Sequence, residues 1–155
     1  MGILLPVLIM LLAFVGACSG SVGGGIKAWR INILIRLAFD NITKIMHPTA
    51  VSTIKFNGEK IEQKQIESVF SFVAIYVLIA ILFLLALMLQ DIDFYSAFSA
   101  VSATLNNLGP GLGAVSENYG SLSMMTKITL CFAMILGRLE IFTLLVVLTP
   151  AFWRR

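Results

Sequence analysis

The chain has 155 residues, of which 59% are hydrophobic and only 12% are charged, and its mean hydropathy is +0.96. This composition excludes an ordinary soluble domain and indicates an integral membrane protein. The net charge of +3 does not indicate a nucleic-acid-binding protein, because the basic residues are scattered beside apolar runs and form no patch with aromatic residues.

The N-terminal run from Met1 to Ala17 is apolar and predicts a membrane-spanning helix, or half of one. The residues Val15 to Cys18 also resemble the end of a lipoprotein signal, with Cys18 as the lipidated residue. No Lys or Arg precedes the apolar run, as the n-region of a signal requires, and another membrane segment follows it. A lipoprotein is therefore the weaker alternative.

A glycine-rich segment follows this run, with glycine at Gly20, Gly23, Gly24 and Gly25. Each glycine costs a helix about 1 kcal/mol relative to alanine, so we expect the helix to break here. A phosphate-binding loop would require a lysine where the chain has Ile26, so a nucleotide site is not favoured. A flexible hinge or a place of close helix packing is the alternative to a functional loop.

The residues from Ile26 to Met46 predict an amphipathic helix that leaves the membrane on the cytoplasmic side and ends before His47 and Pro48. We expect its apolar face to consist of Ile31, Leu34, Ile35, Ala38, Phe39 and Ile42. Such a helix either contacts a regulatory partner or lies on anionic lipid. The polar connection after it contains Asn57-Gly58, which is typical of a hairpin turn.

The residues from Val69 to Leu89 form an uninterrupted apolar run and predict the clearest spanning helix of the chain. Most of the Lys and Arg residues lie in the segment before this run, whereas Asp91, Asp93 and Glu117 lie after it. By the positive-inside rule, the segment before the run is cytoplasmic and the loop after it is external.

The stretch from Asp93 to Gly113 predicts a segment that enters the membrane and turns back. Asp93 can cap a helix, and the small apolar residues after it predict a helix of roughly 11 residues, about 16 Å long, which is half a membrane. The Asn, Gly and Pro residues that follow predict a turn, whose freed carbonyls could replace the water around a cation. An ordinary surface turn between two helices is the alternative.

The residues from Ile128 to Leu148 are long enough to span a membrane, but Arg138 and Glu140 lie near their middle. An arginine at the bilayer centre costs about 2.5 to 3.5 kcal/mol, so it normally faces protein or water. We expect Arg138 to face a pore below the turn, with a structural ion pair as the alternative. Glu140 is left without an assigned role.

Three motifs occur in this order along the chain: GACSGSVGGGIK, ATLNNLGPGLG and GRLEIFTLL. Together they resemble the C-terminal third of the Trk-type potassium uptake proteins of the Trk/Ktr/HKT superfamily, over essentially the whole chain. That superfamily repeats a helix, re-entrant loop, helix unit four times around one pore. The resemblance implies an all-α membrane protein, with one complete repeat preceded by the broken second helix of the previous repeat.

The resemblance also implies which residues form the site. The selectivity filter would consist of Asn106, Asn107, Leu108, Gly109 and Pro110, with potassium coordinated at Asn107 and Leu108. The gate would consist of Gly20, Gly23, Gly24, Gly25 and Arg138. No acid/base pair, nucleophile set or metal cluster is evident in the sequence, so we expect no enzyme and no cofactor, with potassium as the substrate.

The expected organisation has three parts. Residues 1–46 form a broken transmembrane helix with a glycine-rich loop and a cytoplasmic extension, residues 47–66 a cytoplasmic connection, and residues 67–155 a helix, pore helix, filter and helix. One repeat supplies one of four filter segments, so we expect the chain to be a fragment or a subunit that needs the remaining repeats. The resemblance implies a homodimer in the bacterial inner membrane with a cytosolic nucleotide-binding ring. A structural membrane subunit without a pore is the alternative.

Overall fold

A computed structural model describes the chain except for residues 1–3, 17–23, 48–54, 57–58, 140–152 and 154–155. Its helices are α1 (Leu4–Val15), α2 (Ala28–Met46), α3 (Gln63–Met88), α4 (Phe94–Leu105) and α5 (Met124–Arg138), with a short 3₁₀ helix η1 (Gly113–Val115) before α5. The predicted helical fold class is thus confirmed.

A two-stranded hairpin is the one departure from an all-helical chain within the described residues. Strand β1 (Lys55–Phe56) pairs with the antiparallel strand β2 (Glu59–Lys60), so that Lys55 lies opposite Lys60 and Phe56 opposite Glu59. The hairpin lies where the Asn57-Gly58 signal predicts one, although these two residues are outside the described part.

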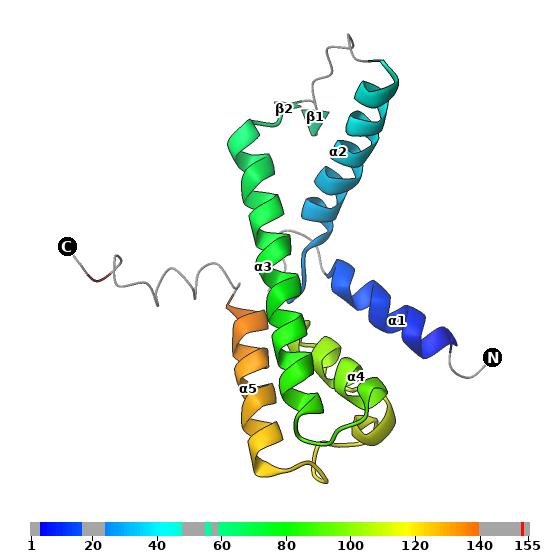
Figure 1. Cartoon of the computed structure of the whole chain (residues 1–155), viewed down its shortest axis with the longest axis vertical. Coiled ribbons are helices and arrows are strands. Elements are labelled where there is room, and N and C mark those ends of the chain that lie inside the picture. The colour runs from blue at the N-terminus through cyan, green and yellow to red at the C-terminus, as the bar shows by residue number, and fades with distance from the viewer. Residues whose placement is uncertain (1–3, 17–23, 48–54, 57–58, 140–152, 154–155) are drawn as a thin grey trace.

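Helix α3 forms the axis of the molecule (Figure 1). It has 26 residues, about 39 Å at 1.5 Å per residue, and within the described residues it is the one helix long and apolar enough to cross a membrane. The predicted run from Val69 to Leu89 lies almost wholly inside it, and the helix begins six residues earlier, at Gln63.

Helices α3, α4 and α5 pack together at one end of the molecule, with α4 and α5 on different sides of α3 (Figure 1). Their shared core consists of Leu87, Ala97, Ala100, Val101, Leu105, Val115, Leu130 and Ala133. Small residues on α4 let its neighbours approach closely, as is common where helices pack inside a membrane. Helix α4 is therefore enclosed by the other elements.

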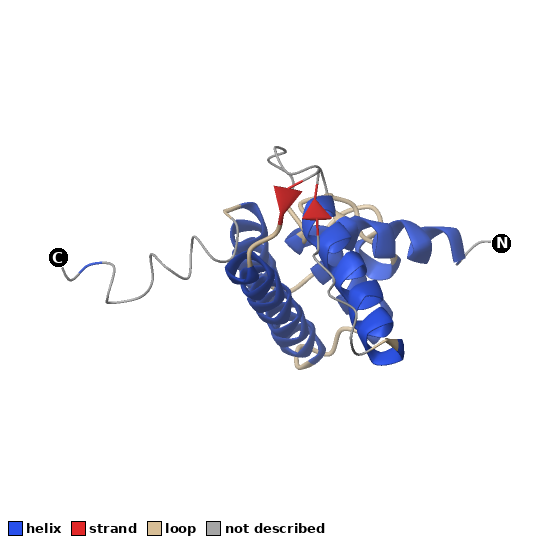
Figure 2. Cartoon of the chain, turned by 90° about the horizontal axis from the view of Figure 1, so that it is seen from above, coloured by secondary structure: helices blue, strands red, loops and turns tan. Residues whose placement is uncertain are grey.

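Helix α1 projects from the side of this bundle (Figure 1 and Figure 2). The aromatic ring of Phe14, near its end, lies 6.0 Å from that of Phe98 on α4 and 6.3 Å from that of Tyr76 on α3. The 12 residues of α1 form half a span, which is one of the two predicted lengths. Cys18, on which the lipoprotein alternative depends, lies outside the described residues.

Helix α2 is amphipathic and ends at Met46, as predicted, but it packs on α3 through a different face. Its buried residues are Ile33 and Asp40, and Ile33 lies in a cluster with Ile61, Ile66 and Val69. Much of the predicted apolar face is exposed, because the contact with α3 uses the neighbouring stripe of the helix: Ile35 is 52%, Phe39 66% and Ile42 54% exposed.

Helix α5 ends at Arg138 in the structure, and the part of the predicted run from residue 140 to Leu148 lies outside the described residues. It begins at Met124, four residues earlier than expected, because Ser123 caps it by accepting a hydrogen bond from the Thr126 amide. Arg138 lies in the last turn of α5 and is exposed.

Candidate functional site

The short helix α4 begins at Asp93, whose carboxylate accepts a hydrogen bond from the Ser96 amide at 3.0 Å. This confirms the predicted N-cap. The same bond lowers the pKa of Asp93 below its ordinary value, because it stabilises the charged carboxylate. The cap fixes where the helix starts, just after the end of α3.

The interior of α4 is buried although it is rich in hydroxyl side chains. The Ser102 hydroxyl donates to the Phe98 carbonyl at 2.7 Å, and the Thr104 hydroxyl donates to the Ala100 carbonyl at 2.7 Å. Each polar group is thus satisfied within its own helix, which removes most of the cost of burying it.

The C-terminus of α4 is closed by a Schellman motif. The Asn107 amide donates to the Thr104 carbonyl at 3.1 Å, and the Leu108 amide donates to the Ala103 carbonyl at 2.9 Å. Asn107 takes the left-handed position, with φ of 54°, which asparagine tolerates better than most residues. The chain therefore stops being helical at Asn106 and turns sharply.

The turn leaves main-chain oxygens without donors. Within the described part of the chain, the carbonyls of Asn106, Asn107 and Leu108 accept no hydrogen bond, and that of Gly109 accepts one from the Tyr119 hydroxyl at 3.0 Å. They follow the C-terminus of α4, which carries the negative end of the helix dipole. Both features favour a cation at this point.

Gly109 has a conformation that other residues rarely adopt. Its φ is 99°, and a Cβ added to it would meet no other atom of the described chain within 4 Å. The requirement for glycine here comes from backbone strain and not from lack of room. Residues 107–110 are all exposed, so this side of the turn faces away from the chain's own core.

The turn lies at mid-length along α3. The Tyr76 hydroxyl donates to the side-chain oxygen of Asn106 at 2.9 Å, in a buried contact. Tyr76 is 13 residues from Gln63 and 12 from Met88, the two ends of α3. Since α4 begins beyond the end of α3, it runs back along half of the spanning helix.

Two glycines enclose the last carbonyl of α4. A Cβ on Gly24 would lie 2.6 Å from the Leu105 oxygen, and a Cβ on Gly137 would overlap the same oxygen. The structure thereby brings the glycine segment and the end of α5, next to Arg138, to the predicted filter. Gly20, Gly23 and Glu140 lie outside the described residues.

The segment that returns from the turn is held against α4. The Gly111 amide donates to the Val115 carbonyl at 3.3 Å, and the Leu112 amide donates to the Ser99 hydroxyl. A side chain at Gly111 would overlap Val115. The turn is consequently anchored on both sides, by the Schellman motif before it and by these bonds after it.

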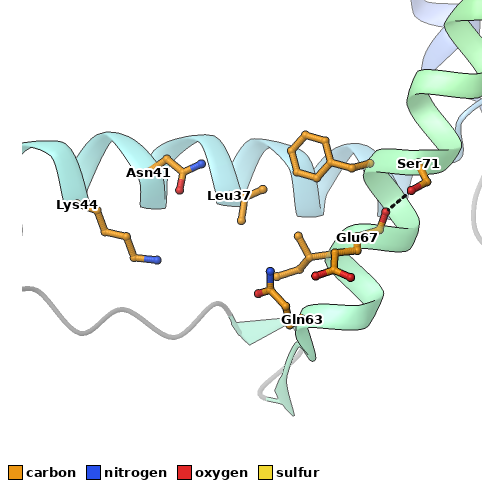
Figure 3. A pocket seen from close by; sticks show the side chains of 8 residues that line it. Leu37, Asn41, Lys44, Gln63, Glu67 and Ser71 are labelled. Carbon is orange, nitrogen blue, oxygen red and sulfur yellow. Dashed lines mark hydrogen bonds between the residues drawn. The ribbon is translucent and has the colours of Figure 1, made fainter.

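A groove of about 520 Å³ lies between α2 and α3, far from the turn along the chain (Figure 3). Lys44 and Asn41 line it from α2, and Gln63 and Glu67 line it from α3. Lys44 is paired with Asp40 at 2.6 Å. No group of three or more His, Cys, Asp or Glu residues that could hold a metal ion is found among the described residues.

Sequence reasoning did not assign roles to three residues at the turn: Tyr76, Tyr119 and Gly137. Tyr76 carried a usable signal, because a hydroxyl inside an apolar spanning run needs a hydrogen-bond partner. Gly137 adjoins Arg138 in the motif GRLEIFTLL, but nothing in the sequence shows that the helix that contains Gly137 contacts α4. Tyr119 lies in the loop between η1 and α5 and carried no such signal.

The comparisons with known proteins match this geometry. A sequence model of the TrkH family, described as cation transport protein, matches residues 4–155. The chain belongs to the TrkH family. It resembles the C-terminal part of these proteins, as the motifs predict. Because TrkH relatives are membrane transporters, the chain is a membrane protein.

Among TrkH relatives, the Trk system potassium uptake protein TrkH of Salmonella typhimurium is 45% identical over 150 residues, which are 97% of this chain and 31% of that protein. TrkG of Escherichia coli, also a Trk system potassium uptake protein, is 37% identical over 148 residues, 96% of this chain and 30% of that protein. The chain spans about a third of the length of these relatives.

A solved structure shows the same fold. The crystal structure of the potassium transporter TrkH from Vibrio parahaemolyticus superposes with a TM-score of 0.88 at 46% identity, covering 97% of this chain and 32% of that one. The arrangement of α3, α4 and α5 is therefore that of a TrkH-family transporter.

Proposed function

We propose that this chain forms part of a Trk-type potassium uptake permease and supplies one of four segments of its selectivity filter. The segment comprises Asn106, Asn107, Leu108, Gly109 and Pro110, and potassium is coordinated at Asn107 and Leu108. One observation carries the proposal: a half-length helix ends at mid-length of the spanning helix and is followed by three carbonyls that accept no hydrogen bond from the described residues.

The physical argument follows from the membrane. Irregular backbone at this depth is tolerated only where protein buries it or where it lines a water-filled cavity. Residues 107–110 are exposed, so they line such a cavity once the chain is assembled. Main-chain carbonyls there replace the hydration shell of a permeating ion, and the negative end of α4 adds to the attraction.

The gate is formed by Gly20, Gly23, Gly24 and Gly25 together with Arg138, directly below this segment. The close approach of Gly24 and of Gly137, the neighbour of Arg138, to the Leu105 carbonyl supports this arrangement. A fixed positive charge beside the filter raises the barrier to cations. Replacing Arg138 by alanine would then raise conductance.

The permease requires partners that the chain does not itself supply. The remaining repeats complete the ring of four filter segments, and the assembly is a homodimer in the bacterial inner membrane, regulated by a cytosolic nucleotide-binding ring. The exposed apolar residues Ile35, Phe39 and Ile42 on α2 suit contact with that ring or with lipid. The membrane potential, worth about 2.3 kcal/mol per charge per 100 mV, drives uptake without a further cofactor.

The test uses a chimera in which this chain replaces the matching third of the Vibrio parahaemolyticus transporter, hereafter the chimera. Rubidium and potassium uptake is measured in potassium-starved cells. Gly109→Ala strains the backbone at the filter and is expected to reduce uptake or the preference for potassium over sodium. Gly120→Ala, in the external loop, meets only the end of the Asn118 side chain and is the control.

Thiol accessibility distinguishes the proposed filter segment from the alternative of a subunit without a pore. In a chimera without other cysteines in this chain, Leu108→Cys is expected to react with a membrane-impermeant thiol reagent. Leu82→Cys on α3 is equally exposed on the chain, 57% against 47%, but faces lipid and is expected not to react. Equal protection of both positions would contradict a water-filled site at the turn.

A further inference from the structure

Two tyrosine hydroxyls meet the two ends of the proposed filter segment. The chain has three tyrosines. Tyr76 of α3 donates to the Asn106 side chain at the inner end, and Tyr119 of the external loop donates to the Gly109 carbonyl at the outer end. The donors come from different elements, so the segment between them is restrained from two directions.

At the inner end, the Tyr76 hydroxyl binds the Asn106 amide, which is held in one orientation. The amide oxygen accepts from Tyr76 at 2.9 Å, and the amide nitrogen donates to the Ser102 carbonyl at 2.8 Å. Exchanging oxygen and nitrogen would set the amide oxygen against the Ser102 carbonyl oxygen, which are both acceptors, so the Ser102 carbonyl fixes the orientation that presents an acceptor to Tyr76. A Cβ on Gly25 would lie 2.9 Å from the same amide oxygen, so the glycine segment also depends on this orientation.

At the outer end, the Tyr119 hydroxyl donates to the carbonyl of Gly109, a residue whose own side supplies no packing contact among the described residues. Gly109 has φ of 99° and open space where a side chain would be. A carbonyl oxygen has two lone pairs, so one hydrogen bond fixes its direction and leaves the second for an ion. Partial burial raises the pKa of Tyr119, so its hydroxyl remains a donor at neutral and mildly alkaline pH.

We propose that Tyr76 and Tyr119 are positioning residues that hold the carbonyls of Asn106 to Gly109 in the geometry that prefers potassium over sodium. This inference rests on the proposed function. Selectivity depends on the size of the ring of carbonyls and on how many of them point at the ion, and a donor that fixes the direction of a carbonyl acts on both. The hydroxyls thereby act on selectivity more than on the rate of uptake.

The experiment compares three Tyr→Phe variants of the chimera, each of which removes one hydroxyl. Tyr119→Phe is expected to lower the preference for potassium over sodium about two- to tenfold, the factor that losing one ordinary hydrogen bond corresponds to. Tyr76→Phe is expected to lower it by a similar factor. Tyr95→Phe, on α4 and 40% exposed, is the matched control and is expected to leave it unchanged.

Expression and thermal stability in detergent are measured alongside the ion preference. These measurements distinguish a positioning role of the tyrosines from a purely structural one. If Tyr76→Phe reduces folding because the Asn106 oxygen is left unpaired, the double variant Tyr76→Phe with Asn106→Leu restores an apolar contact there. The proposal requires that this double variant fold and still lose ion preference. A folded double variant with the wild-type preference overturns the role of Tyr76.

The inference and the proposed function fail in different ways. Unchanged ion preference in Tyr119→Phe and Tyr76→Phe, together with altered uptake in Gly109→Ala, overturns the role of the tyrosines and leaves the filter in place. Unchanged uptake and preference in Gly109→Ala removes the filter itself, and with it the inference.

Discussion

Helices α3 and α4 lie side by side but differ in what surrounds them. Helix α3 has 26 residues, apolar from Phe72 onward, and only five of them are buried: Ile66, Val69, Phe72, Tyr76 and Leu87. Helix α4 has 12 residues, including several with hydroxyl groups, and nine of them are buried. The more hydrophobic helix is therefore the one that faces outward.

This contrast reflects a change of solvent. In water, apolar residues move inward, but lipid offers an apolar side chain as good an environment as the protein does. What selects the buried helix in a membrane is close packing, which favours alanine, serine and threonine. The residues of α4 are small enough for α3, α5 and the glycine segment to reach it, and the hydroxyls of Ser102 and Thr104 are satisfied within the helix.

The largest expected effect is at the contact between α4 and α5. Gly137→Leu would place a side chain where the Leu105 carbonyl already lies, and backbone atoms cannot easily move aside. We expect a loss of stability of more than about 3 kcal/mol, seen as loss of folded chimera by size-exclusion chromatography. Cys131→Leu, at an exposed position of the same helix, is the control and should be tolerated.

A second, smaller effect compares the two helices directly. Ala103→Leu adds three carbons to a position of α4 that is 0% exposed, and we expect it to cost about 1 to 3 kcal/mol. Ala74→Leu makes the same change at an exposed position of α3 and should cost almost nothing. Thermal unfolding in detergent measures both. Equal destabilisation would contradict the view that α3 faces lipid and α4 faces protein.

The long elements could be predicted from sequence because each carries a periodic or uninterrupted pattern. The run from Val69 to Leu89, the cap at Asp93 and the short helix after it were recognisable from residue type alone. The residues by which α2 packs on α3 were not predicted, whereas the exposure of Ile35, Phe39 and Ile42 suits the predicted contact of the apolar face with a partner or with lipid. The periodicity of apolar residues does not show whether the apolar face contacts lipid or protein.

The turn itself was predictable in part. The Asn, Gly and Pro residues after α4 predicted a turn, and Asn107 and Gly109 have positive φ there. The contacts that hold the turn were not predictable, because Tyr76 and Tyr119 are 30 residues before Asn106 and 10 residues after Gly109. Hydrogen bonds between distant elements leave no local pattern. The role of the turn in ion coordination stays a prediction.

A third prediction concerns how the outer end of α3 is joined to α5. The Thr126 hydroxyl donates to the side-chain oxygen of Gln90 at 2.5 Å, and Thr126 is 1% exposed. Thr126→Val keeps the shape of the side chain but removes this donor, so we expect a loss of about 1 kcal/mol in thermal stability. Thr129→Val is the control, because its hydroxyl bonds only to the Met125 carbonyl of its own helix. Similar losses in both variants would rule out a special role for the Gln90 contact.

The smallest expected effect is the dependence of α4 on the charge of Asp93. Its pKa is lowered in the folded chain from the ordinary value of 3.8, because the Ser96 amide stabilises the carboxylate. The cap therefore contributes its full stability above pH 3.8 and loses it as the pH falls through the lower folded-state pKa. Asp93→Asn caps the helix without a titrating group.

The measurement is the difference in thermal stability between the wild-type chimera and Asp93→Asn, followed from neutral pH downward. The difference should stay constant until the pH approaches 3.8, and below that pH the wild-type chimera should lose thermal stability relative to Asp93→Asn. Subtracting the variant removes the contribution of the other carboxylates, which titrate in both proteins. A difference that does not change with pH would mean that packing against neighbouring elements, and not the charged cap, holds α4. The contrast between a helix enclosed by protein and the outward-facing α3 would then include the first turn of α4.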